Sequence, residues 1–132
     1  MRYMLDTNTC IRLIKNRPAQ LLEILKQIDP NDICISSLTY AVLSYEIEKS
    51  SDVWRNRIAL VLFLANIRVL PFDDRAACEY AVIRSESERM ELHIGSPAAM
   101  IAAHARSAGC TVVTNNIREY KRVRNLRIEN WV

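Results

Sequence analysis

Two polar segments that follow apolar runs are the first candidates for chemistry in this sequence. Asp6 follows the run 3–5, and Thr114, Asn115 and Asn116 follow the run 110–113. If both runs are strands of one parallel sheet, these side chains lie at carboxyl ends of strands, where such sheets bind ligands. Asp6 could equally cap the next helix, because an Asp there accepts hydrogen bonds from first-turn amides. The residues alone leave both roles open.

Strand-like and helix-like segments alternate along the chain. Short apolar runs predict strands at 3–5, 33–35, 68–72, 110–113 and 127–128. Helical spacing of apolar residues predicts helices at 7–16, 18–28, 38–50, 53–67, 74–92, 97–108 and 117–123, with 53–67 largely buried. Ser36 or Ser37 and Asp73 or Asp74 are the expected N-caps of two helices, and Gly109 ends another. This order predicts one α/β domain over residues 1–132, with a mainly parallel sheet flanked by helices on both faces.

The composition is that of a globular protein in a reducing compartment. Half of the 132 residues are apolar, and the formal charge of +3 is too small to identify a nucleic-acid binder by itself. Cys10, Cys34, Cys78 and Cys110 are widely spaced, so we expect buried free cysteines and no zinc site. The start lacks a signal segment and no apolar run approaches bilayer length, so we expect a cytoplasmic protein without a membrane partner.

Several other residues suggest function but have structural explanations. Basic residues gather in the C-terminal quarter, where they could contact phosphates or simply form a solvated face: Arg106, Arg118, Lys121, Arg122, Arg124 and Arg127. His104 is expected to be a packed or hydrogen-bonded histidine rather than a general base. Trp54 and Trp131 are expected to pack in the core or an interface rather than to stack on bases.

Five segments, in order over nearly the whole chain, carry a family resemblance. They are MLDTNTCI (4–11), SSLTY with EKS (36–50), IGSP with MIAAHA (94–105), VVTNNIREY (112–120) and RIENWV (127–132). Each is a weak pattern alone, but their order and spacing closely resemble the VapC toxins of bacterial toxin–antitoxin modules. The resemblance implies a PIN-domain endoribonuclease that uses Mg²⁺ or Mn²⁺, with tRNA as the substrate class. It also implies a VapB-type antitoxin as partner, a homodimer and a toxin–antitoxin hetero-oligomer.

The resemblance also implies a site. The catalytic residues would be Asp6, Asn116 and Glu119, and two further carboxylates would lie at positions 42 and 98. Thr7, Asn8, Thr114 and Asn115 would support them: Thr7 and Asn8 by capping the first helix and orienting Asp6, and Thr114 by hydrogen-bonding Asp6. Such a cluster suits Mg²⁺, which takes oxygen ligands and lowers the pKa of a bound water.

The sequence departs from this pattern at both of the other acidic positions. Residue 42 is Val and residue 98 is Ala, and neither side chain can bind a cation. Asp6 and Glu119 would remain as metal ligands, with Glu46 as a substitute. Glu46 lies one helical turn beyond Val42, about 6 Å further along the axis, and metal–oxygen distances tolerate only tenths of an ångström. The structural explanation of Glu46 is a surface pair with Lys49 or Ser50.

Three functions therefore stand as hypotheses. The chain is a metal-dependent nuclease impaired by Val42 and Ala98, or a catalytically inactive toxin fold that dimerises and binds its antitoxin without cutting RNA. A phosphoacceptor receiver domain also places an Asp after a strand of a parallel sheet. The receiver domain is the least favoured of the three hypotheses. The sequence lacks the acidic pair that should accompany the Asp of a receiver domain and the lysine that should follow a late strand.

Overall fold

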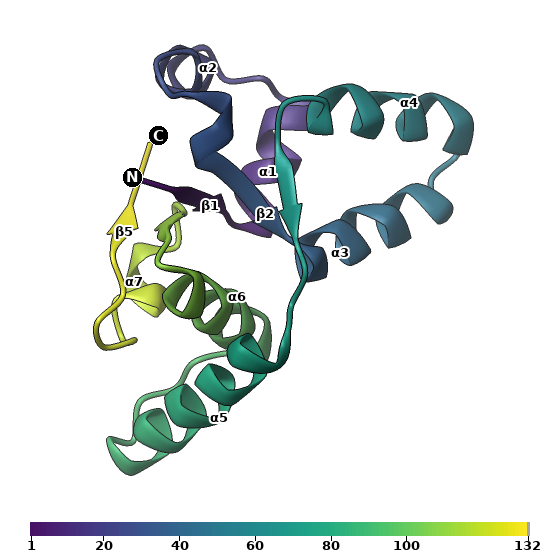
Figure 1. Cartoon of the computed structure of the whole chain (residues 1–132). Helices are drawn as coiled ribbons and strands as arrows, with labels where there is room; N and C mark the ends of the chain where they lie inside the picture. Colours follow the sequence, from purple (N-terminus) through teal and green to yellow (C-terminus); the bar gives the residue numbers. More distant parts are fainter. Residues whose placement is uncertain (132) are drawn as a thin grey trace.

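Five short strands form a single parallel sheet in the computed structural model, which describes residues 1–131 (Figure 1). The strands lie in the order β3-β2-β1-β4-β5, and every neighbouring pair is parallel. Their bounds are β1 Tyr3–Leu5, β2 Ile33–Ser36, β3 Arg68–Leu70, β4 Thr111–Val113 and β5 Ile128–Glu129. Because β1 is central and β4 is beside it, the carboxyl ends of the two strands meet at one edge of the sheet.

One face of the sheet is covered by the helices of the N-terminal half. Leu5, Ile35 and Val113 point to this face and pack with apolar residues of the first four helices. These helices are α1 Thr7–Lys15, α2 Ala19–Lys26, α3 Ser37–Glu48 and α4 Val53–Leu64, with a short 3-10 turn, Pro30–Asp32, before β2. Figure 1 shows α3 and α4 extending together away from the sheet.

The opposite face is covered by the later helices. Met4, Cys34 and Val112 are in register across the three central strands and point to this face. They pack against α5 Asp74–Arg89, α6 Ser96–Ala108 and the region of α7 Ile117–Tyr120. The alternation of side chains along each strand therefore supplies two cores, and the prediction of helices on both faces is confirmed.

The local helix signals in the sequence were reliable. Ser36 caps α3 by accepting from the Leu38 amide, and Asp73 caps α5 by accepting from the Ala76 amide. Gly109 ends α6 with a left-handed φ of 70°. Within residues 1–131, α6 ends at Ala108 as predicted, and the other six helices end one to three residues earlier than predicted.

The prediction that residues 53–67 form a largely buried helix is wrong in its burial. Leu60 is the buried residue of α4, whereas Trp54 is 73% exposed and Leu62 is 70% exposed. The helix packs on α3 and α1 and projects beyond the sheet, so much of its surface meets no other part of residues 1–131. Apolar composition alone could not show this, because it does not say what lies opposite each face.

The cysteine prediction holds for three residues of four. Cys10, Cys34 and Cys110 are buried free thiols, but Cys78 on α5 is exposed, which corrects the expectation of burial. Trp131 is buried and its ring meets Tyr3 edge to face, as expected for core packing. Within residues 1–131, no helix has the length and apolar character needed to cross a membrane.

Candidate active site

Asp6 lies at the junction of β1 and α1 and is only 3% exposed. Its Oδ1 accepts a hydrogen bond from the Thr9 amide at 2.8 Å, and its own amide donates to the Val113 carbonyl of β4 at 3.0 Å. Asp6 is therefore the N-cap of α1, in agreement with the structural role considered from the sequence. The same contacts hold its carboxyl group at the carboxyl edge of the sheet.

Glu119 lies in the first turn of α7 and is held by two contacts. Its Oε1 accepts from Asn116 Nδ2 at 2.8 Å, and its Oε2 accepts from the Gly95 amide at 2.6 Å. Gly95 is the N-cap residue of α6 and has no side chain to satisfy the free amides of that helix. Glu119 thus bridges α7 to the start of α6, and both of its oxygens already have partners.

Tyr120 is a buried residue of α7 that was missed from the sequence. It is 4% exposed, and the pKa of its phenol is raised by burial and by the negative charges of Asp6 and Glu119. The electrostatic effects of both carboxylates therefore reach the same buried phenol. Sequence carries no signal for this, because the aromatic residue simply occupies the core side of a short helix.

Position 42 lies on the helix that faces Asp6. Thr39 of α3 is fully buried, and its Oγ1 is 3.0 Å from Oγ1 of Thr7, the residue after Asp6. Val42 lies three residues beyond Thr39, close to one helical turn of 3.6 residues, so it projects on a similar side of α3. Its side chain is 43% exposed and offers no oxygen donor at the edge of the site.

Position 98 lies in the first turn of α6, next to the helix start that Glu119 holds. Ala98 is 8% exposed and packs with the α5–α6 core. The methyl group of Ala98 is part of this core. Helix α6 needs no acidic residue here to form, because Pro97 and the alanines that follow favour it.

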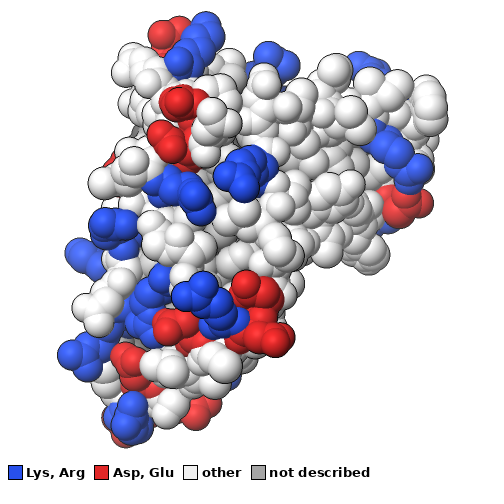
Figure 2. All heavy atoms as spheres, in the orientation of Figure 1, with Lys and Arg blue, Asp and Glu red and all other residues white. Residues whose placement is uncertain are grey.

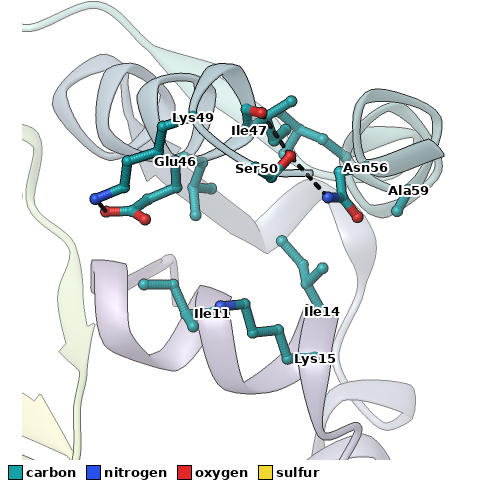
Figure 3. Close-up of a pocket in the computed structure, with 11 residues that line it drawn as sticks. Ile11, Ile14, Lys15, Glu46, Ile47, Lys49, Ser50, Asn56 and Ala59 are labelled. Atoms are coloured by element: carbon teal, nitrogen blue, oxygen red, sulfur yellow. Dashed lines mark hydrogen bonds and ion pairs between the residues drawn. The ribbon is translucent and has the colours of Figure 1, made fainter. Parts of the chain in front are cut away.

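Glu46 lies away from the Asp6 contacts, along the groove between α1, α3 and α4. Its Oε1 pairs with Lys49 Nζ at 3.4 Å, and Figure 3 shows the pair on α3 above Ile11 of α1. The groove measures about 370 Å³ and is largely apolar, with Ile14, Leu43 and Leu60 among its lining. The structural explanation of Glu46, a pair with Lys49, is what the structure shows.

The residues present do not fit an inner-sphere metal site. Among residues 1–131, no group of three or more His, Cys, Asp or Glu side chains is arranged to hold a metal ion. One oxygen of Asp6 and both oxygens of Glu119 accept hydrogen bonds from the protein. Val42 and Ala98 have hydrocarbon side chains and can supply no oxygen ligand to a divalent ion.

The predicted supporting residues have different roles from those expected. Thr7 contacts Thr39 instead of capping α1, and Asn8 is exposed on the first turn. Thr114 Oγ1 accepts from the Asn116 amide at 2.9 Å, and none of its hydrogen bonds within residues 1–131 reaches Asp6. Asn115 is exposed beside it. Thr114 therefore shapes the turn that brings Asn116 to Glu119.

The basic residues of the C-terminal quarter divide into two groups. Arg106 pairs with Glu79 and Glu86, and Arg122 donates to the His93 carbonyl, so both have structural partners. Figure 2 shows Lys and Arg side chains spread along this part of the molecule with acidic ones among them. The exposed cations near α7 are Arg118, Lys121 and Arg124.

His104 is a structural residue, as expected. It is 3% exposed, its Nδ1 lies 2.8 Å from Ser36 Oγ, and Phe72 packs edge to face on its ring. Because Ser36 caps α3 and His104 belongs to α6, this contact joins the helices that carry positions 42 and 98. It fixes their relative placement on the two sides of the sheet.

Comparisons with known proteins agree with this geometry. The family model described as "PIN domain" matches residues 3–126. A Salmonella typhimurium protein named tRNA(fMet)-specific endonuclease VapC is 42% identical over 131 residues, covering 99% of this chain and 98% of its own. The chain belongs to the VapC family of PIN-domain ribonucleases.

Other VapC relatives extend the similarity. The Shigella flexneri protein of the same name is 44% identical, covering 99% of this chain and 98% of its own. The crystal structure of DNA-bound VapBC from Salmonella typhimurium superposes with a TM-score of 0.94 at 42% identity, covering 100% of this chain and 99% of that one. The PIN fold predicted from the VapC resemblance is thereby confirmed.

Proposed function

We propose that this chain is the toxin component of a type II toxin–antitoxin module, with a tRNA-directed endoribonuclease fold whose cleavage is impaired by Val42 and Ala98. One observation supports the proposed impairment. Asp6 and Glu119 have carboxylates, whereas the side chains of Val42 and Ala98 contain no oxygen. The substrate class rests on the names of relatives over 40% identical, which are tRNA(fMet)-specific endonucleases.

Mg²⁺ or Mn²⁺ is the cofactor proposed for the ancestral chemistry of this fold. Such an ion supplies an activated water and stabilises charge on the phosphorus. Loss of an outer-sphere partner alone typically lowers metal affinity or activity about 10–100-fold. The absence of two direct ligands should therefore lower cleavage by more than about 100-fold.

A VapB-type antitoxin is the proposed partner, in a hetero-oligomer built on a toxin homodimer. The proposal is supported by the Salmonella relative, whose structure is a VapBC complex. On this chain, Trp54, Val61 and Leu62 of α4 are 64–73% exposed. Exposed apolar surface of this kind is typical of protein–protein contacts.

The test is cleavage of total tRNA in Mg²⁺ or Mn²⁺ by the chain and by the double variant Val42→Glu, Ala98→Asp. We expect the double variant to cut more than about 100-fold faster, because it restores two anionic ligands. The matched control is Val42→Gln, Ala98→Asn, which has nearly the same shape without the charge and should stay as slow as the chain.

The proposed impairment is refuted if the chain cuts tRNA as fast as the double variant and Asp6→Ala abolishes the cutting. A chain with no detectable cleavage beside an active double variant supports the second candidate, an inactive toxin fold that binds its antitoxin. The observation that favours this candidate is an intact apolar groove next to an incomplete metal site.

A further inference from the structure

Two buried thiols face each other on the α5–α6 side of the sheet. Cys34 of β2 and Cys110, the residue before β4, lie with their Sγ atoms 3.9 Å apart. Cys34 is 1% exposed and Cys110 is 3% exposed. A disulfide bond is about 2.05 Å long, so closing this pair requires a movement of roughly 2 Å.

Cys110 is the member of the pair that lines a surface cavity. The cavity measures about 410 Å³ and is also lined by Gly109, Leu126 and Arg127. Gly109 is exposed and has a left-handed φ of 70°, and a Cβ built on it would meet nothing within 4 Å. The space beside the residue before Cys110 is therefore unoccupied by other parts of residues 1–131.

The surroundings of the two sulfurs differ in a way that sets their roles. A hydrogen bond from Cys34 and the charges of Arg2 and Arg127 hold the pKa of the Cys110 thiol below its usual value. The pKa of Cys34 is raised by the same contact and by burial. The lowered pKa of Cys110 and the raised pKa of Cys34 favour the thiolate form at Cys110 over that at Cys34, as in a pair of an attacking and a resolving cysteine.

We propose that Cys34 and Cys110 form a reversible disulfide when the protein meets a hydroperoxide, which makes this pair a redox-responsive site. The Cys110 thiolate attacks one peroxide oxygen, the O–O bond breaks, and Cys110 becomes a sulfenic acid as hydroxide leaves. Cys34 sulfur then attacks Cys110 sulfur and displaces the hydroxyl, which leaves as water with the Cys34 proton. Two thiols are oxidised and one peroxide is reduced, and added dithiol reverses the reaction.

The two other cysteines provide internal comparisons. Cys78 is exposed and has no cysteine neighbour, so it reacts with peroxide or alkylating reagents but forms no internal bond. Cys10 is fully buried, and the pKa of its thiol is raised by burial and by the charge of Asp6, so it stays reduced in the folded chain. Trypsin separates all four cysteines, because Cys34 falls in peptide 27–49 and Cys110 in peptide 107–118.

The experiment treats the full chain with hydrogen peroxide, blocks remaining thiols after denaturation, and maps the tryptic peptides by mass spectrometry. We expect peptides 27–49 and 107–118 to become linked, with a mass loss of about 2 Da that dithiothreitol reverses. The proposal is overturned if these peptides stay unlinked at a peroxide dose that fully oxidises Cys78. The outcome needs no substitution, so it does not depend on any variant folding.

Variants in a Cys78→Ser background test the order of events. In Cys34→Ala, the Cys110 sulfenic acid has no resolving thiol, so dimedone should label peptide 107–118. In Cys110→Ala, dimedone should label neither peptide. Equal labelling of Cys34 in Cys110→Ala would overturn the assigned roles. The matched control, Cys10→Ala, should form the Cys34–Cys110 bond as fully as the parent.

Discussion

Two side chains at the carboxyl edge of the sheet have structural roles as well as the catalytic roles proposed for them. Asp6 caps α1, and Glu119 accepts a hydrogen bond from the Gly95 amide at the start of α6. Each residue therefore stabilises the fold even without a metal ion. Val42 is half exposed and Ala98 fills a core position, so each substitution is compatible with its helix. Hydrocarbon side chains at positions 42 and 98 are therefore compatible with the fold around Asp6 and Glu119.

His104 gives the chain a measurable pH dependence. Burial lowers its pKa below the ordinary 6.5, against smaller opposing effects of Asp73 and Pro71, so the folded chain resists protonating it. The unfolded chain binds the proton as pH falls through about 6.5, so this residue makes the folded state less stable from there down to its folded pKa. We expect the free energy of unfolding to fall by up to about 1.4 kcal/mol per pH unit from this residue.

Urea unfolding between about pH 7.5 and 5.5 measures this effect. His104→Gln should flatten the slope of the free energy of unfolding against pH. Equal slopes for the parent and His104→Gln would show that His104 is not held neutral by the fold.

At the scale of elements, helices α3 and α4 form the part of the chain with the most exposed apolar surface. The exposure of nearby residues of α4 differs sharply, because Leu60 is 6% exposed under the groove and Leu62 is 70% exposed. One face of the helix therefore packs against the rest of the described chain, and the other face is exposed. Residues on the packed face stabilise the fold, and residues on the exposed face are available to a partner.

A pair of alanine variants tests this division. Leu60→Ala should lower the free energy of unfolding by about 2–5 kcal/mol, because it leaves a cavity. Leu62→Ala should change it by less than about 0.5 kcal/mol in dilute protein. Similar losses for both, measured by urea unfolding, would mean that the exposed face of α4 is covered in solution by part of this protein.

Local signals predicted most elements, and tertiary contacts explain what they missed. Ser36, Asp73 and Gly109 mark helix ends through contacts within a few residues, so their roles could be predicted. The exposure of α4 and of Cys78 could not, because it depends on which helices pack opposite them. In the site, the family motif predicted Asp6 and Glu119, but the contact of Thr39 with Thr7 and the burial of Tyr120 near the two charges arise only through folding.

For the molecule as a whole, the VapC fold extends across the chain, and we propose that its acidic cluster is incomplete at positions 42 and 98. The fold superposes on the Salmonella VapBC structure with a TM-score of 0.94, whereas no group of three metal-binding side chains is found within residues 1–131. The fold can exist without a metal site, because two apolar cores stabilise the sheet and neither depends on a bound ion.

Calorimetric titration with Mn²⁺ tests the central claim most directly. We expect the double variant Val42→Glu, Ala98→Asp to bind one Mn²⁺ per chain, and the parent to show no saturable heat at the concentration that saturates the variant. The amide pair Val42→Gln, Ala98→Asn should behave like the parent. Parent binding within about 3-fold of the double variant, lost in Asp6→Ala, would contradict the claim that Val42 and Ala98 disable the metal site.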